Sequence, residues 1–365
     1  MTQPLLELSK IQSIWYDNIE RRLMKSGQLK QLITDGISGV TSNPSIFEKA
    51  ILSSADYDMD ISRLAKSGKS TEEVYNELTT SDIAEAADIL KPTFDKSNHQ
   101  DGFVSIEVSP EYAYDKAKTV ESAKYLFKQL ARPNIMIKVP ATAECIPAIR
   151  ELIAEGININ VTLIFSLPHY ENVANSYISG LEERLNRKLP LNNVFSVASV
   201  FISRIDTRID AICKEPSLKG KPAVANTKII YQAYRNIFSS DADGGGRFGK
   251  LAKAGANKQR VLWASTSAKN PAYSDIKYVQ EIIAPDSINT IPPTTINAFK
   301  DHGKPEITIT KDMDDAQKVM ESLKQQKIDI VRECQELQNE GVKAFADAYK
   351  KTIDAIKVKV DKLSI

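Results

Sequence analysis

One lysine of the chain, Lys138, lies inside the apolar run NIMIKVPAT at residues 134–142. Such a run predicts a short buried strand with an amine near its C-terminal end. Desolvation favours the neutral form of a lysine, and a neutral amine attacks carbonyl carbons. Lys138 is therefore a candidate for forming a Schiff base with a carbonyl substrate. Lysines at strand ends also commonly extend into solvent without any chemical role. The residues at the ends of the other predicted strands distinguish these two interpretations.

Polar residues recur at the ends of the other short β-rich runs. Seven of the eight predicted strands contribute at least one, and the set is Asp17, Asn43, Glu107, Lys138, Asn160 with Thr162, Ser199, and Ser265. Each also has an ordinary explanation. Asp17 can be a helix N-cap, Asn43 a turn former before a proline, and the two serines small packing residues. Seven separate local explanations, one for each strand end, are a weaker account than a single site that all these residues share. The set therefore predicts a functional site.

The residue types in this set suit a reaction through an imine. Loss of water from a carbinolamine and cleavage of a carbon–carbon bond each need a group that moves a proton, and Asp17 and Glu107 can do this. Thr162 can hold a water for Glu107, and Asn43 and Asn160 can hydrogen-bond to sugar hydroxyls. The imine is the electron sink, so we expect neither a cofactor nor a metal ion. The sequence also has no His-x-His, His-Glu-x-x-His or carboxylate-triad spacing.

A cation and several hydroxyls follow the sixth and seventh predicted strands. Arg204 ends the run SVFISR, and Ser265 begins the run STSAKN at residues 265–270. Phosphate sites in barrels commonly form near this part of the mouth, from backbone N–H groups, hydroxyls and a cation. The alternative is that Arg204 is an ordinary surface arginine at the start of a polar helix.

The elements that must position these residues alternate along the chain. Strands are expected at residues 13–17, 39–43, 103–108, 135–139, 157–165, 195–203, 260–266 and 288–292, with helices such as 115–130, 145–154, 169–186 and 274–283 between them. Eight strand–helix units predict an α/β fold, a closed (β/α)8 TIM barrel with extra helices in its loops and at its C-terminus. A doubly wound open sheet is the alternative, but its glycine-rich first turn is absent from the run WYDNIE at residues 15–20.

Two long connections and a helical tail extend the predicted barrel. We expect a single domain over residues 1–365, with a helical and loop insertion at 205–259 and C-terminal helices at 313–365. The connection 44–102 must also hold several helices, including one at 71–90. Residues 239–246 are rich in glycine, serine and aspartate, which is typical of an exposed, mobile loop.

Composition and charge indicate which binding partners and which cellular compartment to expect for the chain. The chain has 365 residues with a formal net charge of +1, which argues against a nucleic acid or an anionic membrane as partner. Its start has no secretory signal pattern, and no apolar stretch is long enough to span a bilayer. Three scattered cysteines, Cys145, Cys213 and Cys334, suit a reducing cytoplasm and give no disulfide framework. We therefore expect a cytoplasmic protein.

At these residues the chain resembles the transaldolases, in particular the longer bacterial type. The matching runs are GVTSNPSIF at 39–47, SIEV at 105–108, IMIKVPAT at 135–142, NINVTLIFS at 158–166, VASVFISR at 197–204 and LWASTS at 262–267. They occur in family order and, with Asp17, cover most of the chain. The Thr-Ser-Asn-Pro element and the lysine strand are specific when they occur together.

The resemblance implies a role for each matched catalytic residue. Lys138 resembles the imine-forming lysine, and Asp17 resembles the acid/base that handles the proton of the donor's C4 hydroxyl. Glu107 and Thr162 resemble the pair that positions a catalytic water.

The resemblance also implies the binding residues. Asn43, Asn160 and Ser199 resemble residues that hold the dihydroxyacetone unit, and Arg204 and Ser265 resemble phosphate ligands. The chain departs from the family pattern two residues after that serine. Many transaldolases have a second phosphate-binding arginine there, whereas this chain has Ser267. We expect Lys269, two residues further on, to supply the missing charge, which is an inference and not part of the resemblance.

The implied reaction moves a three-carbon dihydroxyacetone unit between sugar phosphates. Donors would be sedoheptulose 7-phosphate or fructose 6-phosphate, and acceptors glyceraldehyde 3-phosphate or erythrose 4-phosphate, in the non-oxidative pentose phosphate pathway. The expected partners are therefore sugar phosphates, and the chain is expected to be a monomer or homodimer.

Two other functions fit the same scaffold. A lysine-dependent aldolase would release free dihydroxyacetone when no aldehyde acceptor is present. A catalytically silent barrel would be expected to lack Lys138, Asp17 or Glu107, and all three are present.

Overall fold

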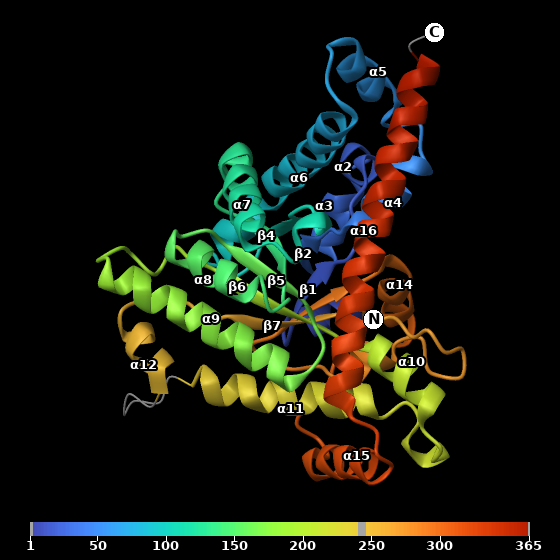
Figure 1. Cartoon of the computed structure of the whole chain (residues 1–365). Coiled ribbons are helices and arrows are strands. Elements are labelled where there is room, and N and C mark those ends of the chain that lie inside the picture. The colour runs from blue at the N-terminus through green and yellow to red at the C-terminus, as the bar shows by residue number, and fades with distance from the viewer. Residues whose placement is uncertain (1–2, 240–245, 364–365) are drawn as a thin grey trace.

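The protein forms a closed barrel of eight parallel strands in sequence order (Figure 1). The structure is a computed structural model that describes residues 3–239 and 246–363. The strands are β1 Ser13–Tyr16, β2 Ile37–Thr41, β3 Val104–Glu107, β4 Ile135–Pro140, β5 Ile159–Ile164, β6 Ser196–Phe201, β7 Arg260–Ala264 and β8 Ile288–Ile291. All eight predicted strands are present, within a few residues of the expected ends. The predicted (β/α)8 barrel with extra helices is therefore confirmed.

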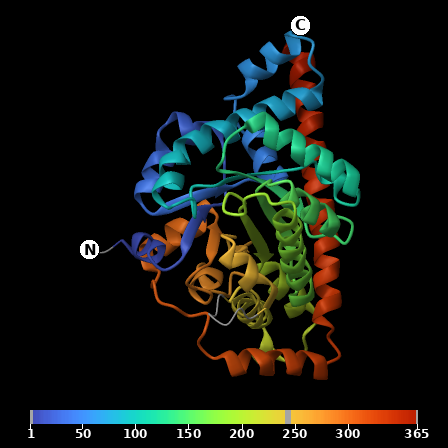
Figure 2. The ribbon, with the colours of Figure 1, turned by 90° about the vertical axis from the view of Figure 1, so that its left-hand side faces the viewer.

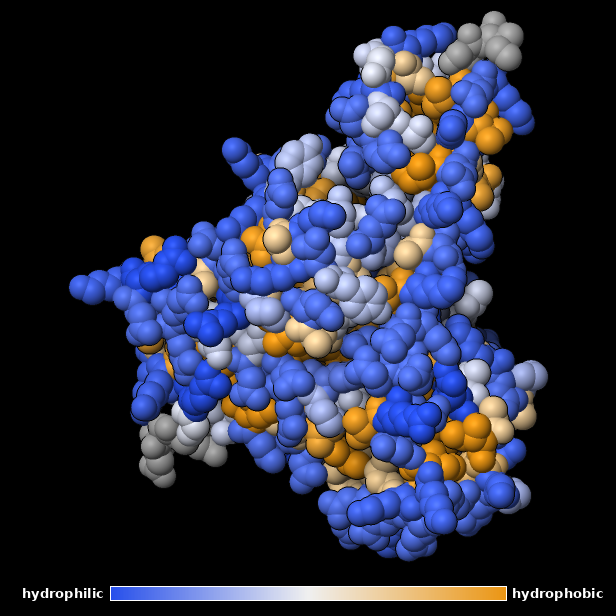
Figure 3. Space-filling view, viewed as in Figure 1, coloured by the Kyte–Doolittle hydropathy of each residue, from blue (hydrophilic) through white to orange (hydrophobic). Residues whose placement is uncertain are grey.

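Helices surround the barrel and extend beyond it (Figures 1 and 2). Their bounds are α1 Pro4–Ser9, α2 Arg21–Lys25, α3 Gln28–Thr34, α4 Pro44–Leu52, α5 Asp58–Lys66, α6 Thr71–Lys96, α7 Lys116–Leu130, α8 Ile146–Ala154, α9 Leu167–Asn186, α10 Ser203–Ile212, α11 Pro222–Ile237, α12 Gly246–Lys253, α13 Lys277–Gln280, α14 Pro293–His302, α15 Met313–Gln325 and α16 Ile330–Leu363. Short 3-10 turns lie at Pro110–Tyr112 and Pro216–Leu218. The face in Figure 3 is predominantly hydrophilic, with small hydrophobic groups beside the two ends of α16.

Two helices differ from the sequence prediction. The helix expected at 274–283 is reduced to α13, Lys277–Gln280. The backbone at Ile283 instead pairs with Thr308, whose hydroxyl accepts from the Ile283 N–H and whose own N–H donates to the Ile283 carbonyl. Helix α6 continues beyond residue 90, through Pro92, to Lys96. Most of the expected mobile loop at 239–246 lies outside the described residues.

The barrel strands are buried, and polar side chains at the N-terminal end of the barrel form hydrogen bonds and an ion pair with one another. Every residue of β4, β5 and β6 is buried, as expected for parallel strands covered on both faces. At the N-terminal end of the barrel, Asp101 accepts hydrogen bonds from Ser13 (2.5 Å) and Trp15 (2.8 Å) and pairs with Arg260 at 3.5 Å. These charges close the end of the barrel that parallel-barrel enzymes use for stability, and leave the opposite end for chemistry.

The long helix α16 brings the end of the chain back across the barrel. It has 34 residues, about 51 Å of helix, and runs along nearly the whole height of the molecule (Figures 1 and 2). Gln338 donates from Nε2 to the carbonyl oxygens of Ala141 (3.0 Å) and Leu163 (2.9 Å), which lie at the ends of β4 and β5. A Cβ on Gly341 would lie 2.8 Å from the Leu163 side chain, so the glycine permits this close approach. The helix therefore forms part of the wall at the C-terminal ends of the strands.

Candidate active site

Lys138 lies on β4 with its amine directed into the mouth of the barrel. The residue is 5% exposed. Its Nζ donates a hydrogen bond to the carbonyl oxygen of Ser42 (2.8 Å) and lies 3.5 Å from Glu107 Oε2. The lysine was expected to be buried, and it is. The structure adds a carbonyl group that fixes the direction of the amine and a carboxylate with which it can exchange a proton.

Glu107 is the last residue of β3 and sits beside Lys138 in the strand register. Its side chain is 6% exposed. Burial raises the pKa of Glu107, the Lys138 ammonium opposes this, and the charge of Asp17 raises the pKa further. Oε2 has no hydrogen-bond partner in the described part of the chain apart from the 3.5 Å contact with Lys138. A carboxyl group whose pKa is raised beside an amine can take up a proton and give it back in a reaction.

Asp17 follows β1 and is held by a threonine of the next strand. Its Oδ1 accepts a hydrogen bond from Thr41 Oγ1 (2.8 Å), and Thr41 Oγ1 lies 2.5 Å from Thr290 Oγ1. Burial raises the pKa of Asp17, and the hydrogen bond from Thr41 and the charge of Lys138 lower it in part. The N-cap of the following helix α2 is Glu20. Asp17 is therefore not a helix cap, which removes the ordinary explanation for it.

A cavity of about 200 Å³ opens at this end of the barrel. It is lined by Asp17, Thr41, Asn43, Ser45, Lys138, Thr162, Ser199, Phe201, Arg204, Ala264, Ser265, Ser267, Lys269, Thr290, Pro292 and Phe345. The lining includes every residue predicted for the site except Glu107 and Asn160. Eight residues from separate strands and loops thus meet in one pocket, which we call the substrate pocket.

Asn160 lies deeper in the barrel than expected. It is fully buried; its Nδ2 donates to Ser105 Oγ (3.0 Å), and its Oδ1 accepts from Ser199 Oγ (2.6 Å). Asn160 therefore positions Ser199, which lines the pocket. Asn43 both lines the pocket and caps α4, because its Oδ1 accepts from the Ile46 N–H (3.0 Å). Thr162 Oγ1 is buried without a hydrogen-bond partner among the described residues.

Positive charge gathers at one side of the substrate pocket. Lys269 Nζ donates to Ser267 Oγ (2.7 Å), and the Arg204 guanidinium lies 5.5 Å from the Phe201 ring centroid. Burial lowers the pKa of Lys269, the charge of Arg204 lowers it further, and Asp17 opposes the shift. Arg204 is only half-buried yet lines the pocket, so it is not an ordinary surface residue. The two cations form a corner suited to an anion.

Ser265 adds a strained backbone to this corner. It follows β7 with a φ of 55°, a left-handed conformation that is uncommon for residues other than glycine. Its hydroxyl lies 3.0 Å from Ser203 Oγ, at the start of α10. Strain of this kind is concentrated at functional sites and must be supported by the surrounding structure.

Several pocket residues were not predicted from the sequence. Thr41 could have been found, because it lies two residues before Asn43 and so shares its face of the strand run. Thr290 lies on β8, for which no polar strand-end residue was proposed. Phe345 comes from α16, and no local pattern places that helix over the pocket.

Comparisons with known proteins place the chain in a family. The model of the family Transaldolase/Fructose-6-phosphate aldolase matches residues 14–356. The chain belongs to this family. It is 42% identical to a transaldolase of Trichodesmium erythraeum, over 100% of this chain and 99% of that protein. It is 41% identical to a transaldolase of Saccharopolyspora erythraea, over 96% and 95% of the two chains. The resemblance drawn from the sequence motifs is therefore confirmed.

The described residues contain neither a cluster of metal-binding side chains nor a membrane-spanning helix. Within residues 3–239 and 246–363, no three His, Cys, Asp or Glu side chains gather so that they could hold a metal ion. Among the described helices, none is long and apolar enough to cross a membrane.

A buried carboxylate anchors the helix that carries Arg204. Asp206 lies two residues further along α10 and is 1% exposed. Its Oδ1 accepts from the Ala223 N–H and its Oδ2 from the Tyr278 hydroxyl, both at 2.8 Å. Burial raises the pKa of Asp206 to about 6, although both hydrogen bonds oppose the shift. Asp206 thus ties α10 to α11 and α13 at the cost of burying a charge.

This buried charge predicts a pH-dependent stability. The folded pKa of about 6 lies above the ordinary value of 3.8, so the folded state binds the proton more tightly. The resulting stabilisation is nearly complete below about pH 3 and is lost as pH rises through 6, a change of roughly 3 kcal/mol. Denaturant unfolding of the wild type and Asp206→Asn should therefore show a stability difference that shifts by about this amount, in favour of the variant, between pH 3 and 7. A pH-independent difference would contradict the assignment.

Proposed function

We propose that the protein transfers a dihydroxyacetone unit from sedoheptulose 7-phosphate or fructose 6-phosphate to glyceraldehyde 3-phosphate or erythrose 4-phosphate. The observation that carries this proposal is the buried pairing of Lys138 with Glu107 beside Asp17, in one pocket with Arg204 and Lys269. Membership of the transaldolase family and the names of the full-length relatives support it. The corresponding pathway is the non-oxidative pentose phosphate pathway, and three buried free cysteines are consistent with a cytoplasmic enzyme.

Imine formation is assigned to Lys138 and Glu107. The amine attacks the ketone carbon of the donor and gives a carbinolamine. Glu107 then protonates the leaving hydroxyl, so the C–O bond breaks, water departs and the nitrogen lone pair forms the C=N bond. The carboxylate that remains is 3.5 Å from the lysine nitrogen in the resting enzyme, where it can stabilise the positive iminium. The unpartnered Thr162 hydroxyl can hold the water.

Cleavage is assigned to Asp17. Its raised pKa makes it a stronger base than an exposed aspartate, so it can take the proton of the C4 hydroxyl. The C3–C4 electrons then move into the iminium, the aldehyde product leaves, and an enamine remains on Lys138. Attack of the enamine on a second aldehyde reverses these steps. Thr41 holds Asp17 in place, and Asn43 and Ser199 can bind the hydroxyls of the retained unit.

Trapping of the imine tests the proposal directly. Borohydride in the presence of fructose 6-phosphate should add a dihydroxyacetone-derived mass to the peptide that contains Lys138, because reduction makes the imine bond permanent. Lys138→Ala should lose both trapping and turnover. Modification of a different lysine, found by peptide mass mapping, would contradict the assignment. Free dihydroxyacetone released without an aldehyde acceptor would instead indicate an aldolase.

Substitutions of the two carboxylates should affect different steps. Asp17→Asn should slow carbon–carbon cleavage by roughly 10²–10⁴-fold, the usual contribution of a general base, while leaving imine formation faster than cleavage. Glu107→Gln should slow imine formation and hydrolysis. Single-turnover kinetics that follow trapped imine and aldehyde release separate the two effects. Near-normal rates in both variants would remove both residues from the proton transfers.

The corner formed by Arg204 and Lys269, which we call the phosphate corner, can be tested with two alanine variants. Loss of a charge-assisted hydrogen bond costs about 1.5–3 kcal/mol, so Arg204→Ala should raise KM for fructose 6-phosphate roughly 10–100-fold. Lys269→Ala should raise it less, because an ammonium makes no two-pronged contact. KM for unphosphorylated fructose is the matched control and should change little. An unchanged KM in Lys269→Ala at low ionic strength would show that Lys269 does not replace the family's second arginine.

A further inference from the structure

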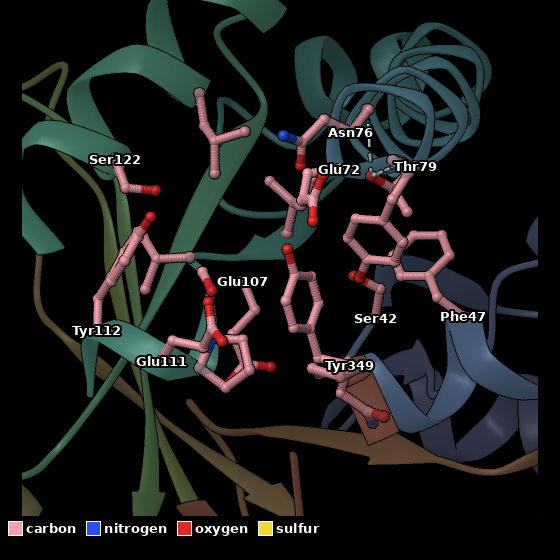
Figure 4. Close-up of a pocket in the computed structure, with 18 of the residues that line it drawn as sticks. Ser42, Phe47, Glu72, Asn76, Thr79, Glu107, Glu111, Tyr112, Ser122 and Tyr349 are labelled. Carbon is pink, nitrogen blue, oxygen red and sulfur yellow. Dashed lines mark hydrogen bonds between the residues drawn. The ribbon is translucent and has the colours of Figure 1, made fainter. Parts of the chain in front are cut away.

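A second cavity is lined by Glu107 and lies next to the active site; its lining is drawn in Figure 4. Its volume is about 210 Å³, similar to that of the substrate pocket. Glu107 lines this cavity and not the substrate pocket. Ser42, whose carbonyl accepts from Lys138, also lines it. The catalytic ion pair therefore lies in the wall between the two cavities, with Lys138 facing one and Glu107 the other.

The two cavities have opposite charge. The substrate pocket contains the cations Lys138, Arg204 and Lys269. The second cavity has Glu107 inside and the exposed Glu72 and Glu111 among its lining, and no lysine or arginine is among the described residues that line it. Such a cavity repels sugar phosphates, which enter the cationic pocket instead. Small neutral molecules, above all water, are not excluded.

The inner lining of the second cavity is polar, and part of it lacks partners. Apart from the 3.5 Å contact of Glu107 Oε2 with Lys138, Glu107 Oε2 and Ser109 Oγ are buried without hydrogen-bond partners among the described residues. Buried polar groups of this kind are usually satisfied by water, and the cavity has room for several water molecules. Phenol groups complete the lining: Tyr349 enters from α16, and burial together with Glu111, Glu72 and Tyr112 raises its pKa to about 12. Tyr349 therefore keeps its proton near neutral pH and can donate a hydrogen bond to water.

We propose that the second cavity is a water chamber that serves the imine steps through Glu107. This inference rests on the proposed function. When the carbinolamine loses its hydroxyl, Glu107 supplies the proton, and the water formed passes into the chamber. In hydrolysis a water that has moved from the chamber past Glu107 into the substrate pocket gives a proton to the Glu107 carboxylate while its oxygen attacks the iminium carbon. A bound sugar phosphate occupies the substrate pocket during both steps. Water that is released or consumed must therefore be held elsewhere, and the chamber is the polar space next to Glu107.

Filling the chamber from either wall tests this assignment. Ser122 on α7 and Thr79 on α6 line opposite sides of the cavity, with Glu107 between them (Figure 4). Leucine and then phenylalanine at either position should displace progressively more water without touching Lys138 or the substrate pocket. Ser122→Ala and Thr79→Ala remove the hydroxyls without filling space and are the matched controls. Thermal unfolding identifies any variant that fails to fold, and leucine is the smaller replacement in that case.

The expected result is a selective loss of the imine steps. The rates of borohydride trapping and of oxygen exchange between H2¹⁸O and the donor carbonyl should fall by roughly tenfold or more, and by no more than the 10²–10⁴-fold that acid–base catalysis contributes. The rate of carbon–carbon cleavage from imine already formed and the KM for fructose 6-phosphate should stay near their wild-type values. The alanine controls should form and hydrolyse the imine at wild-type rates. A simple packing defect would lower all steps together.

Two outcomes separate failure of this inference from failure of the proposed function. Folded leucine and phenylalanine variants that form and hydrolyse imine at the wild-type rate would overturn the water chamber while leaving the transaldolase assignment intact. Absence of any trapping at Lys138 in the wild-type enzyme would overturn the proposed function itself.

Discussion

The ion pair between Lys138 and Glu107 is the interaction around which the site is built. Both side chains are almost fully buried, and the pair spans neighbouring strands in register. Taking two charges out of water costs about as much as their attraction returns, so a buried pair adds little net stability. Its value here is chemical. A carboxyl group with a raised pKa beside an amine can move protons to and from the reacting groups, which is what the proposed formation and hydrolysis of an imine require.

The rest of the fold keeps that pair buried and aimed. The barrel places Lys138 and Glu107 side by side and puts Asp17 within electrostatic reach of both. The carbonyl of Ser42, which follows β2, accepts a hydrogen bond from the Lys138 amine on β4 and fixes its direction. Helix α16 then covers the strand ends, held by the two hydrogen bonds from Gln338, and its aromatic residues reach both cavities: Phe345 the substrate pocket and Tyr349 the acidic one. One helix thus contributes to the lining of both cavities.

The sequence predicted most of the barrel because strands and helices leave local patterns. The polar strand ends converged as expected, since parallel strands bring their C-terminal ends to one face. The errors have local physical causes. The predicted helix around Ser274 is short because Ile283 pairs with a distant loop, and α6 continues through Pro92, where a helix was expected to end. Phe345 and the second cavity depend on where α16 docks. An amphipathic pattern shows that a helix buries one face, but it does not say against what.

The departure at Ser267 changes what the phosphate corner can recognise. An arginine holds a phosphate in one orientation through two parallel hydrogen bonds, whereas a lysine is a flexible point charge. In this chain Lys269 donates to Ser267, so the serine anchors a cation that extends from further along the loop. The proposed donors and acceptors differ in the number of carbons between the reacting carbon and the phosphate, while the proposed imine would fix the reacting carbon at Lys138. One fixed guanidinium and one mobile ammonium suit phosphates that arrive at slightly different positions, which is the demand that transfer between sugars of unequal length places on this site.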